Sequence, residues 1–159
     1  MLTYYEYRQK HFGNQSPIGL GAYAAVFQHE DPDLVVKISN SDQAYHLYAT
    51  WAQKNQHNPF VPRIFSHERV DLKFDFYTVT VLEALDPLDP QLVKPILSRV
   101  GFESLEELQD SFESCGSSIS NGFIKDIFDF RKSSKRYLDL GRQNLMLRYD
   151  QLVFTDPVC

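Results

Sequence analysis

The first half of the chain alternates between short apolar segments and turns, a pattern that predicts antiparallel strands. Residues 18–27 (IGLGAYAAVF) form two short candidate strands around a glycine-containing turn, and residues 34–38 (LVVKI) are a β-branched run of strand length. Residues 63–70 and 75–83 are β-branched and alternate in polarity, as the two arms of a hairpin do. The sequence therefore predicts a five-stranded antiparallel sheet.

One helix is expected among these strands. Ser41 and Asp42 are residue types that cap helices well, and the apolar positions of the following segment, AYHLYATWAQK, lie near helical spacing. A helix of about three turns is therefore predicted between the third and fourth strands.

The pattern changes after residue 87. Residues 88–98, 104–114 and 121–136 have the apolar spacing of helices, whereas residues 144–147 and 152–154 are short apolar strands that form a hairpin. With 159 residues, the chain is long enough for one domain with a hydrophobic core. We expect a single α+β domain, 1–159, in which a sheet-rich part (1–86) is followed by a reduced, mostly helical part (87–159).

Charge and composition exclude several classes of function. The formal charge is −5, from 16 basic and 21 acidic residues, so nucleic-acid binding is disfavoured. The N-terminus lacks the pattern of a secretory signal, no apolar run approaches the length of a membrane span, and the two cysteines form no framework. We expect a cytoplasmic protein without membrane association.

Three smaller features of the sequence have simple structural explanations. The basic cluster at 131–136 (RKSSKR) could hold a phosphate or an acidic partner, although a solvated face explains it more simply. The five histidines have no metal-ligand spacing, which favours ordinary core and surface roles. Tyr4, Tyr5 and Tyr7 are predicted to pack against the sheet.

A glycine pair precedes a lysine-bearing strand. Gly19 and Gly21 open the pattern G-x-G-A-Y-A-x-V, which ends at Val26, and Lys37 lies in the next strand. Glycines are common in tight hairpins for steric reasons alone, and Lys37 could simply face solvent. In protein kinases, however, a glycine-rich hairpin covers the nucleotide phosphates and a lysine of the following strand contacts them. The order of these features favours a nucleotide-phosphate site.

A second group of polar residues lies near the C-terminal hairpin. Asp139 is followed five residues later by Asn144 at the start of a strand, and Asp156 follows the partner strand. Capping and turn roles could explain these residues singly. After a glycine hairpin and a strand lysine, their order instead matches a kinase catalytic base followed by two oxygen ligands for magnesium.

Several blocks of this sequence resemble the early-expressed serine/threonine protein kinases of T7-like bacteriophages. The blocks are GLGAYAAVF, LVVKI, DQAY, the VP turn at 61–62, YTVTVLEAL, DLGRQNLML and LVFTDPV, in that order. The resemblance implies a reduced protein-kinase-like fold that uses ATP and Mg²⁺. By role, it implies phosphate or nucleotide contacts from Gly19, Gly21, Val26 and Lys37, adenine contacts through the backbone at Glu83 and Leu85, a catalytic pair of Asp139 and Lys37, and metal ligands Asn144 and Asp156.

The implied function is transfer of the ATP γ-phosphoryl group to a serine or threonine of a bacterial host protein, in the cytoplasm of the infected cell. Two departures favour an alternative, a pseudokinase that binds and inhibits a host or defence protein. The helix offers only Asp42 or Gln43 to pair with Lys37, where ordinary kinases have a glutamate. Only three residues of this sequence, up to Cys159, follow Asp156, where ordinary kinases continue into an activation segment. A kinase that acts on a small molecule is a third interpretation. The oligomeric state is left open.

Overall fold

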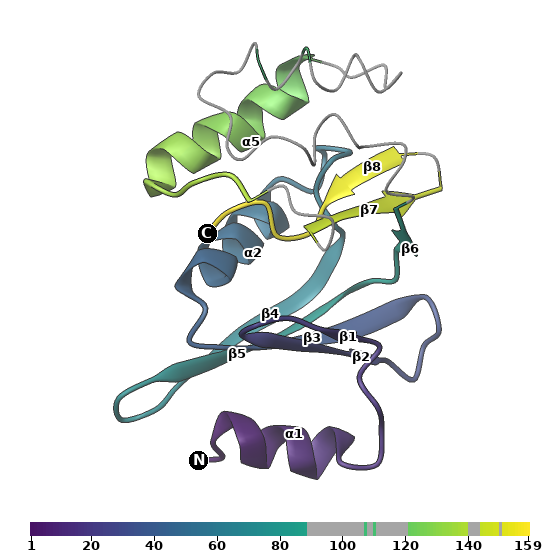
Figure 1. Ribbon diagram of the computed structural model, residues 1–159, viewed down its shortest axis with the longest axis vertical. Coiled ribbons are helices and arrows are strands. Elements are labelled where there is room, and N and C mark those ends of the chain that lie inside the picture. The colour runs from purple at the N-terminus through teal and green to yellow at the C-terminus, as the bar shows by residue number, and fades with distance from the viewer. Residues whose placement is uncertain (89–106, 108–109, 111–120, 140–143, 150) are drawn as a thin grey trace. The chain divides into compact units, whose positions relative to one another are not determined.

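The computed structural model describes residues 1–88, 107, 110, 121–139, 144–149 and 151–159, which form two compact units. The first unit contains residues 1–54 and 63–84, and the second contains residues 55–62 and 85–159. The described part is an α+β structure with a five-stranded antiparallel sheet and three helices (Figure 1). The predicted helices at 88–98 and 104–114 lie outside the described residues, apart from Leu88, Glu107 and Asp110.

The sheet of the first unit confirms the predicted antiparallel arrangement. Its strands are β1 (Gly19–Leu20), β2 (Ala24–Gln28), β3 (Leu34–Asn40), β4 (Ile64–Asp71) and β5 (Phe76–Glu83). They pair in the order β1-β2-β3-β5-β4, so β3 and β5 lie inside the sheet. Side chains that alternate along β3 divide between the two faces, and both faces are covered by a helix.

One face of the sheet is covered by α1 (Tyr4–Phe12), a helix that the sequence analysis missed. Thr3 and Glu6 form a reciprocal capping box at its start, which satisfies two backbone N–H groups that the helix would otherwise leave unpaired. Tyr4 packs into a buried cluster with residues of β2, β3 and β5, and Tyr7 packs against that cluster, as predicted. Tyr5, by contrast, is 71% exposed, so that part of the prediction was wrong.

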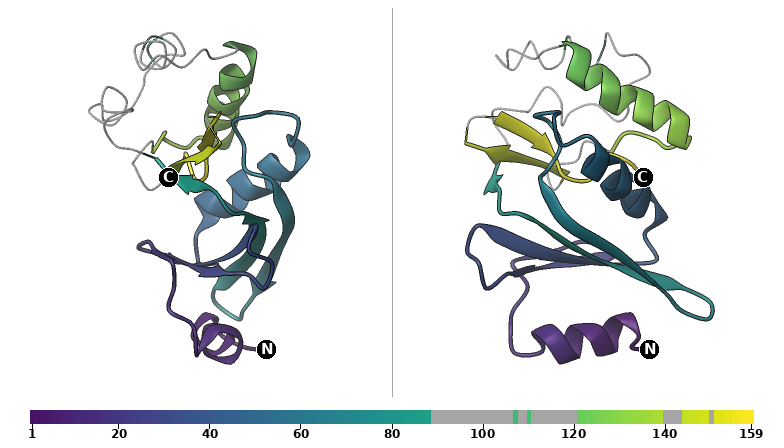
Figure 2. Two further views of the ribbon diagram at one scale, coloured as in Figure 1. Left: turned by 90° about the vertical axis from the view of Figure 1, so that its right-hand side faces the viewer. Right: turned by 180° about the vertical axis from the view of Figure 1, so that it is seen from behind.

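The opposite face is covered by α2 (Gln43–Lys54), the predicted helix, and the two helices lie on either side of the sheet in both views of Figure 2. Asp42 is its cap, because the Asp42 carboxylate accepts from the backbone N–H of Tyr45 at 2.9 Å. Tyr45 and Tyr48 are among the side chains that the helix buries, at 1% and 0% exposure. This tight packing fixes which residues of α2 face the sheet.

The second unit contains α5 (Asn121–Ser134) and a three-stranded sheet of β6 (Asp86–Pro87), β7 (Leu145–Arg148) and β8 (Gln151–Phe154). The β7–β8 hairpin confirms the prediction for the C-terminal strands. Arg148 ties this sheet to the 55–62 segment, since its guanidinium donates to the carbonyls of Pro59 and Val61 at 3.0 and 2.9 Å. The backbone N–H of Phe154 also donates to Phe60.

None of the described helices is long and apolar enough to cross a membrane.

Candidate functional site

The structure brings the three late polar residues together within the second unit. The backbone N–H of Asp139 donates to the carbonyl of Pro157 at 2.7 Å, directly after Asp156. The backbone carbonyl of Asn144 accepts from Thr155 at 2.8 Å, directly before Asp156. Asp139 and Asn144 therefore both attach to the short segment that carries Asp156, although they lie far before it in the sequence.

The side chain of Asn144 closes this local network. Asn144 is 8% exposed, and its amide nitrogen donates to the backbone carbonyl of Asp139 at 3.0 Å. Because that bond engages the nitrogen, it sets the amide so that the side-chain oxygen faces away from the Asp139 carbonyl. The oxygen is the atom that a hard cation would require.

The carboxylates of Asp139 and Asp156 both affect the pKa of the Cys159 thiol. Burial raises the pKa of the Cys159 thiol, the negative charge of Asp139 raises it further, and Asp156 adds a smaller effect in the same direction. The Arg136 guanidinium opposes these effects. Two carboxylates that influence one thiol lie in the same neighbourhood, so the two acids and Asn144 form one local set.

In the first unit, three of the predicted residues occupy one row across the sheet. Gly19 is the direct cross-strand partner of Val26, and Val26 is the partner of Lys37. The row continues from Lys37 to Thr80 and from Thr80 to His67. Direct partners in antiparallel strands place their side chains on the same face, so this row lies on the face that α2 covers.

Lys37 is half-buried and meets an aromatic ring of α2. Its Nζ atom lies 3.5 Å from the centre of the Tyr45 ring, within the range of a cation–π interaction. The two residues expected to pair with the lysine have other roles, because Asp42 caps the helix and Gln43 accepts from the Arg69 guanidinium at 3.0 Å. Tyr45 is therefore a residue of α2 that contacts Lys37.

Neither glycine of the hairpin is required by the local backbone. Gly19 and Gly21 lack the positive φ that favours glycine, and a Cβ atom at Gly19 would meet Val26 only at 3.6 Å. At Gly21 the nearest atom to such a Cβ would be the Ala24 carbonyl oxygen at 3.9 Å. The steric explanation of the glycine pair therefore does not account for it.

Glu83 and Leu85 are the residues expected at the adenine contact. Glu83 is the last residue of β5, and Leu85 lies two residues after it. The backbone N–H of Glu83 donates to the Arg63 carbonyl at 3.0 Å, and its buried carboxylate accepts from the Arg63 N–H at 2.8 Å. The N–H group of Glu83 is therefore engaged within the first unit. Leu85 is half-buried and belongs to the second unit.

A histidine pair escaped the sequence analysis. The Nδ1 atom of His46 on α2 lies 2.9 Å from Nε2 of His67 on β4, and His67 Nδ1 lies 2.8 Å from the Thr80 hydroxyl. Burial lowers the pKa of His67 to about 4, and the neighbouring His46 contributes to that shift. The two residues are 21 positions apart, and no spacing rule connects a helix with a strand at that distance.

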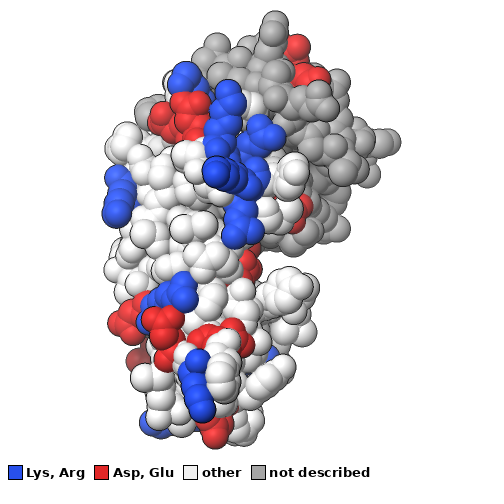
Figure 3. All heavy atoms as spheres, turned by 90° about the vertical axis from the view of Figure 1, so that its left-hand side faces the viewer, with Lys and Arg blue, Asp and Glu red and all other residues white. Residues whose placement is uncertain are grey.

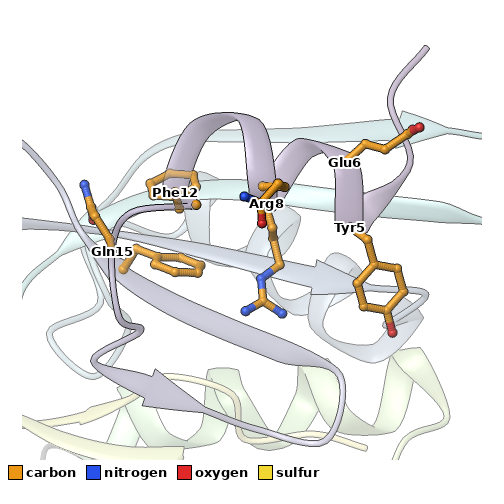
Figure 4. A pocket seen from close by; sticks show the side chains of 8 residues that line it. Tyr5, Glu6, Arg8, Phe12 and Gln15 are labelled. Atoms are coloured by element: carbon orange, nitrogen blue, oxygen red, sulfur yellow. The ribbon is translucent and has the colours of Figure 1, made fainter.

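The open groove beside α1 contains none of the predicted site residues. It measures about 520 Å³ and is lined by Tyr5, Phe12 and Phe27, among others. Figure 4 shows the Arg8 side chain directed into this groove, and its guanidinium carbon lies 5.4 Å from the centre of the Phe27 ring. The predicted residues instead form two sets, one in each unit, and their convergence on one nucleotide stays a prediction.

The oxygen donors of the second set suit magnesium by their chemistry. The described residues include no group of three or more His, Cys, Asp or Glu side chains that could hold a metal ion. A cation held there would therefore use the mixed pair of one amide and one carboxylate, Asn144 and Asp156, together with groups from a phosphate ligand.

No known protein-family model matches the chain, and no curated protein matches its sequence.

Proposed function

We propose that this protein is a kinase-like phosphotransferase that transfers the γ-phosphoryl group of magnesium ATP to a serine or threonine of a bacterial host protein. The observation that carries the proposal is the hydrogen-bonded set of Asp139 and Asn144 with the segment that bears Asp156. A carboxylate base and two oxygen ligands beside one hairpin are what phosphoryl transfer to a hydroxyl requires. The nature of the acceptor and the infected bacterial cytoplasm as its location follow from the resemblance alone.

The second support is the row that joins Gly19, Val26 and Lys37. A lysine on the third strand of a sheet, one strand after a glycine hairpin, has the position of the phosphate-binding lysine in protein kinases. Glycines that the backbone itself does not require are consistent with close approach of a ligand to the chain.

The residues divide the chemistry between them. Asp139 would accept the proton of the attacking hydroxyl, and Lys37 would neutralise charge on the phosphate oxygens. Asn144 and Asp156 would hold magnesium, which supplies further charge neutralisation when it is bound. The rate gain comes from positioning and electrostatic stabilisation, because no covalent enzyme intermediate is needed.

A second candidate is a pseudokinase that binds and inhibits a host or defence protein. One observation favours it. The ring of Tyr45, and not a carboxylate of the helix cap, contacts Lys37 from α2. Active protein kinases use a glutamate of that helix to position the lysine, so its replacement here is consistent with weak or lost catalysis.

The test compares wild-type protein with Asp139→Asn in host lysate that contains radiolabelled ATP and magnesium. If the kinase proposal is correct, the wild type labels host proteins. Removal of the base should reduce that labelling by a factor of about 100 or more. Asp129→Asn is the matched control, since Asp129 is an exposed acid of α5 that pairs with Lys125. Equal labelling by wild type and Asp139→Asn would refute the assignment of the base.

The pseudokinase alternative predicts a different result. In that case wild-type protein labels nothing, yet it captures the same host protein as Asp139→Asn does. Melting temperatures with and without millimolar magnesium ATP complete the comparison, because a ligand that binds only the folded state raises the melting temperature. No shift and no labelling would exclude the kinase.

A further inference from the structure

The C-terminal end of α5 gathers four cations into one tight turn. We call Arg131, Lys132, Lys135 and Arg136 the basic loop. The N–H of Lys135 donates to the Lys132 carbonyl at 3.3 Å, and the N–H of Arg136 donates to the Arg131 carbonyl at 3.2 Å. These are the two hydrogen bonds of a Schellman motif, so all four cations belong to the turn that ends the helix.

Two features of this turn differ from what helix stability favours. Lys135 has φ 56°, the left-handed conformation in which glycine is usual and a Cβ atom is unfavourable. Arg131 and Arg136 occupy the two positions where such motifs commonly make an apolar contact. Cations near a helix C-terminus do complement its dipole, but that effect does not explain the left-handed lysine. The motif therefore keeps positive charge at the expense of stability.

Among the residues that the structure describes, none of the four side chains of the basic loop forms an ion pair with a carboxylate, although Arg136 shares the neighbourhood of Cys159 with Asp139 and Asp156. Lys132 and Lys135 are exposed, and Arg131 and Arg136 are half-buried. Arg131 and Lys132 both lie over the ring of Phe128, at 5.1 and 5.8 Å, which limits how far they can move. Figure 3 shows Lys and Arg side chains gathered on the face that includes this end of α5.

We propose that the basic loop is a docking surface for a short acidic segment of a partner protein. The chain carries 16 basic residues, four of them in this loop, against 21 acidic residues. A long polyanion such as a nucleic acid would extend beyond the loop onto an acidic protein, where it would be repelled. A few consecutive Asp or Glu side chains, in contrast, span no more than the loop itself. This inference does not depend on the kinase proposal.

The test measures fluorescence anisotropy of a labelled eight-residue peptide rich in Asp and Glu, beside a neutral Ser-Gly peptide and a single-stranded oligonucleotide of the same charge. Of the three ligands, we expect only the acidic peptide to bind well. Its affinity should fall as the salt concentration rises from about 50 to about 200 mM, because salt screens the attraction between exposed charges. The double variant Lys132→Glu/Lys135→Glu should bind about tenfold more weakly. Absence of peptide binding, or tighter binding of the oligonucleotide, would overturn the proposal.

A second variant separates charge from folding. Lys135→Gly removes the strain of the left-handed lysine together with its charge, so it should raise the melting temperature by about 3 °C while it weakens peptide binding several-fold. Tyr149→Gly is the matched control, because Tyr149 also has a left-handed φ of 55° and is 87% exposed. It should raise the melting temperature without any change in binding. Wild-type affinity in Lys135→Gly would contradict the docking role.

Discussion

The ammonium group of Lys37 lies 3.5 Å from the centre of the Tyr45 ring, so the lysine of β3 meets an aromatic face of α2. A ring face attracts a cation through its quadrupole but cannot accept its proton. The Tyr45 ring therefore contributes to the orientation of Lys37, a task that a glutamate of the corresponding helix has in active kinases.

This contact predicts how Tyr45 affects nucleotide binding. Tyr45→Leu removes an interaction of about 0.5–2 kcal/mol and should weaken magnesium ATP binding by about twofold to thirtyfold, whereas Tyr45→Phe keeps the ring and the affinity. Calorimetric titration gives the affinities. Tyr48→Leu is the control for lost packing, since Tyr48 is equally buried on the same helix. If the two leucine variants weaken binding equally, orientation of Lys37 by Tyr45 is not supported.

Gly19 provides a test of ligand approach. An alanine there meets only Val26 at 3.6 Å and needs no positive φ, so the free energy of unfolding should change by less than about 0.5 kcal/mol. If phosphates lie against this hairpin, Gly19→Ala should nonetheless reduce the rise in melting temperature that magnesium ATP produces. Chemical denaturation and thermal shift measure the two effects separately. An unchanged thermal shift would argue against coverage of the phosphates by Gly19.

Cys159 reports on the two acids. Because Asp139 and Asp156 both raise the pKa of its thiol, Asp139→Asn and Asp156→Asn should each lower that pKa and accelerate alkylation by iodoacetamide near pH 8, by about twofold or more. The measurement uses a Cys115→Ser background, and Asp129→Asn should leave the rate unchanged. Equal rates in all variants would show that the carboxylates do not share this neighbourhood.

The histidine pair predicts a stability that depends on pH. The pKa of His67 is lowered from 6.5 to about 4 in the folded state. The contribution of neutral His67 to the free energy of unfolding is therefore fully present above pH 6.5 and is lost as the pH falls toward 4. Unfolding by urea at several pH values should show this decline, and His67→Gln should reduce its slope. It should also lower stability at pH 7.5 by about 1 kcal/mol through the weakened contacts to His46 and Thr80. His57→Gln, at an exposed position, is the control variant.

Local patterns sufficed for most elements that the structure describes. The β-branched run of β3 and the alternation of polar and apolar residues in β4 and β5 predict strands, because a two-residue repeat is visible within a few residues. The cap of α2 was also found, although Asp42 and not Ser41 takes that role. The helix α1 was missed because its aromatic side chains are not gathered on one helical face, so the sequence shows no apolar repeat at helical spacing. Its one local signal was the capping box of Thr3 and Glu6.

Contacts between distant residues could not be found in this way. The two-residue strand β6 exists only because Asp86 and Pro87 pair with β7 in antiparallel fashion. Their partners lie about sixty residues further along the chain. His46 and His67 likewise meet only because α2 lies across the sheet beside β4.

The order of the glycine hairpin, the strand lysine and the late Asp, Asn and Asp was readable in the linear chain, since each depends on nearest neighbours and on residue chemistry. Packing decided the rest. It placed Gly19, Val26 and Lys37 in one row, put Tyr45 and not Asp42 against the lysine, and joined Asn144 to Asp139. Strand register and the face that a helix buries arise from the sum of many weak contacts over the whole unit, and no short stretch of sequence contains that sum.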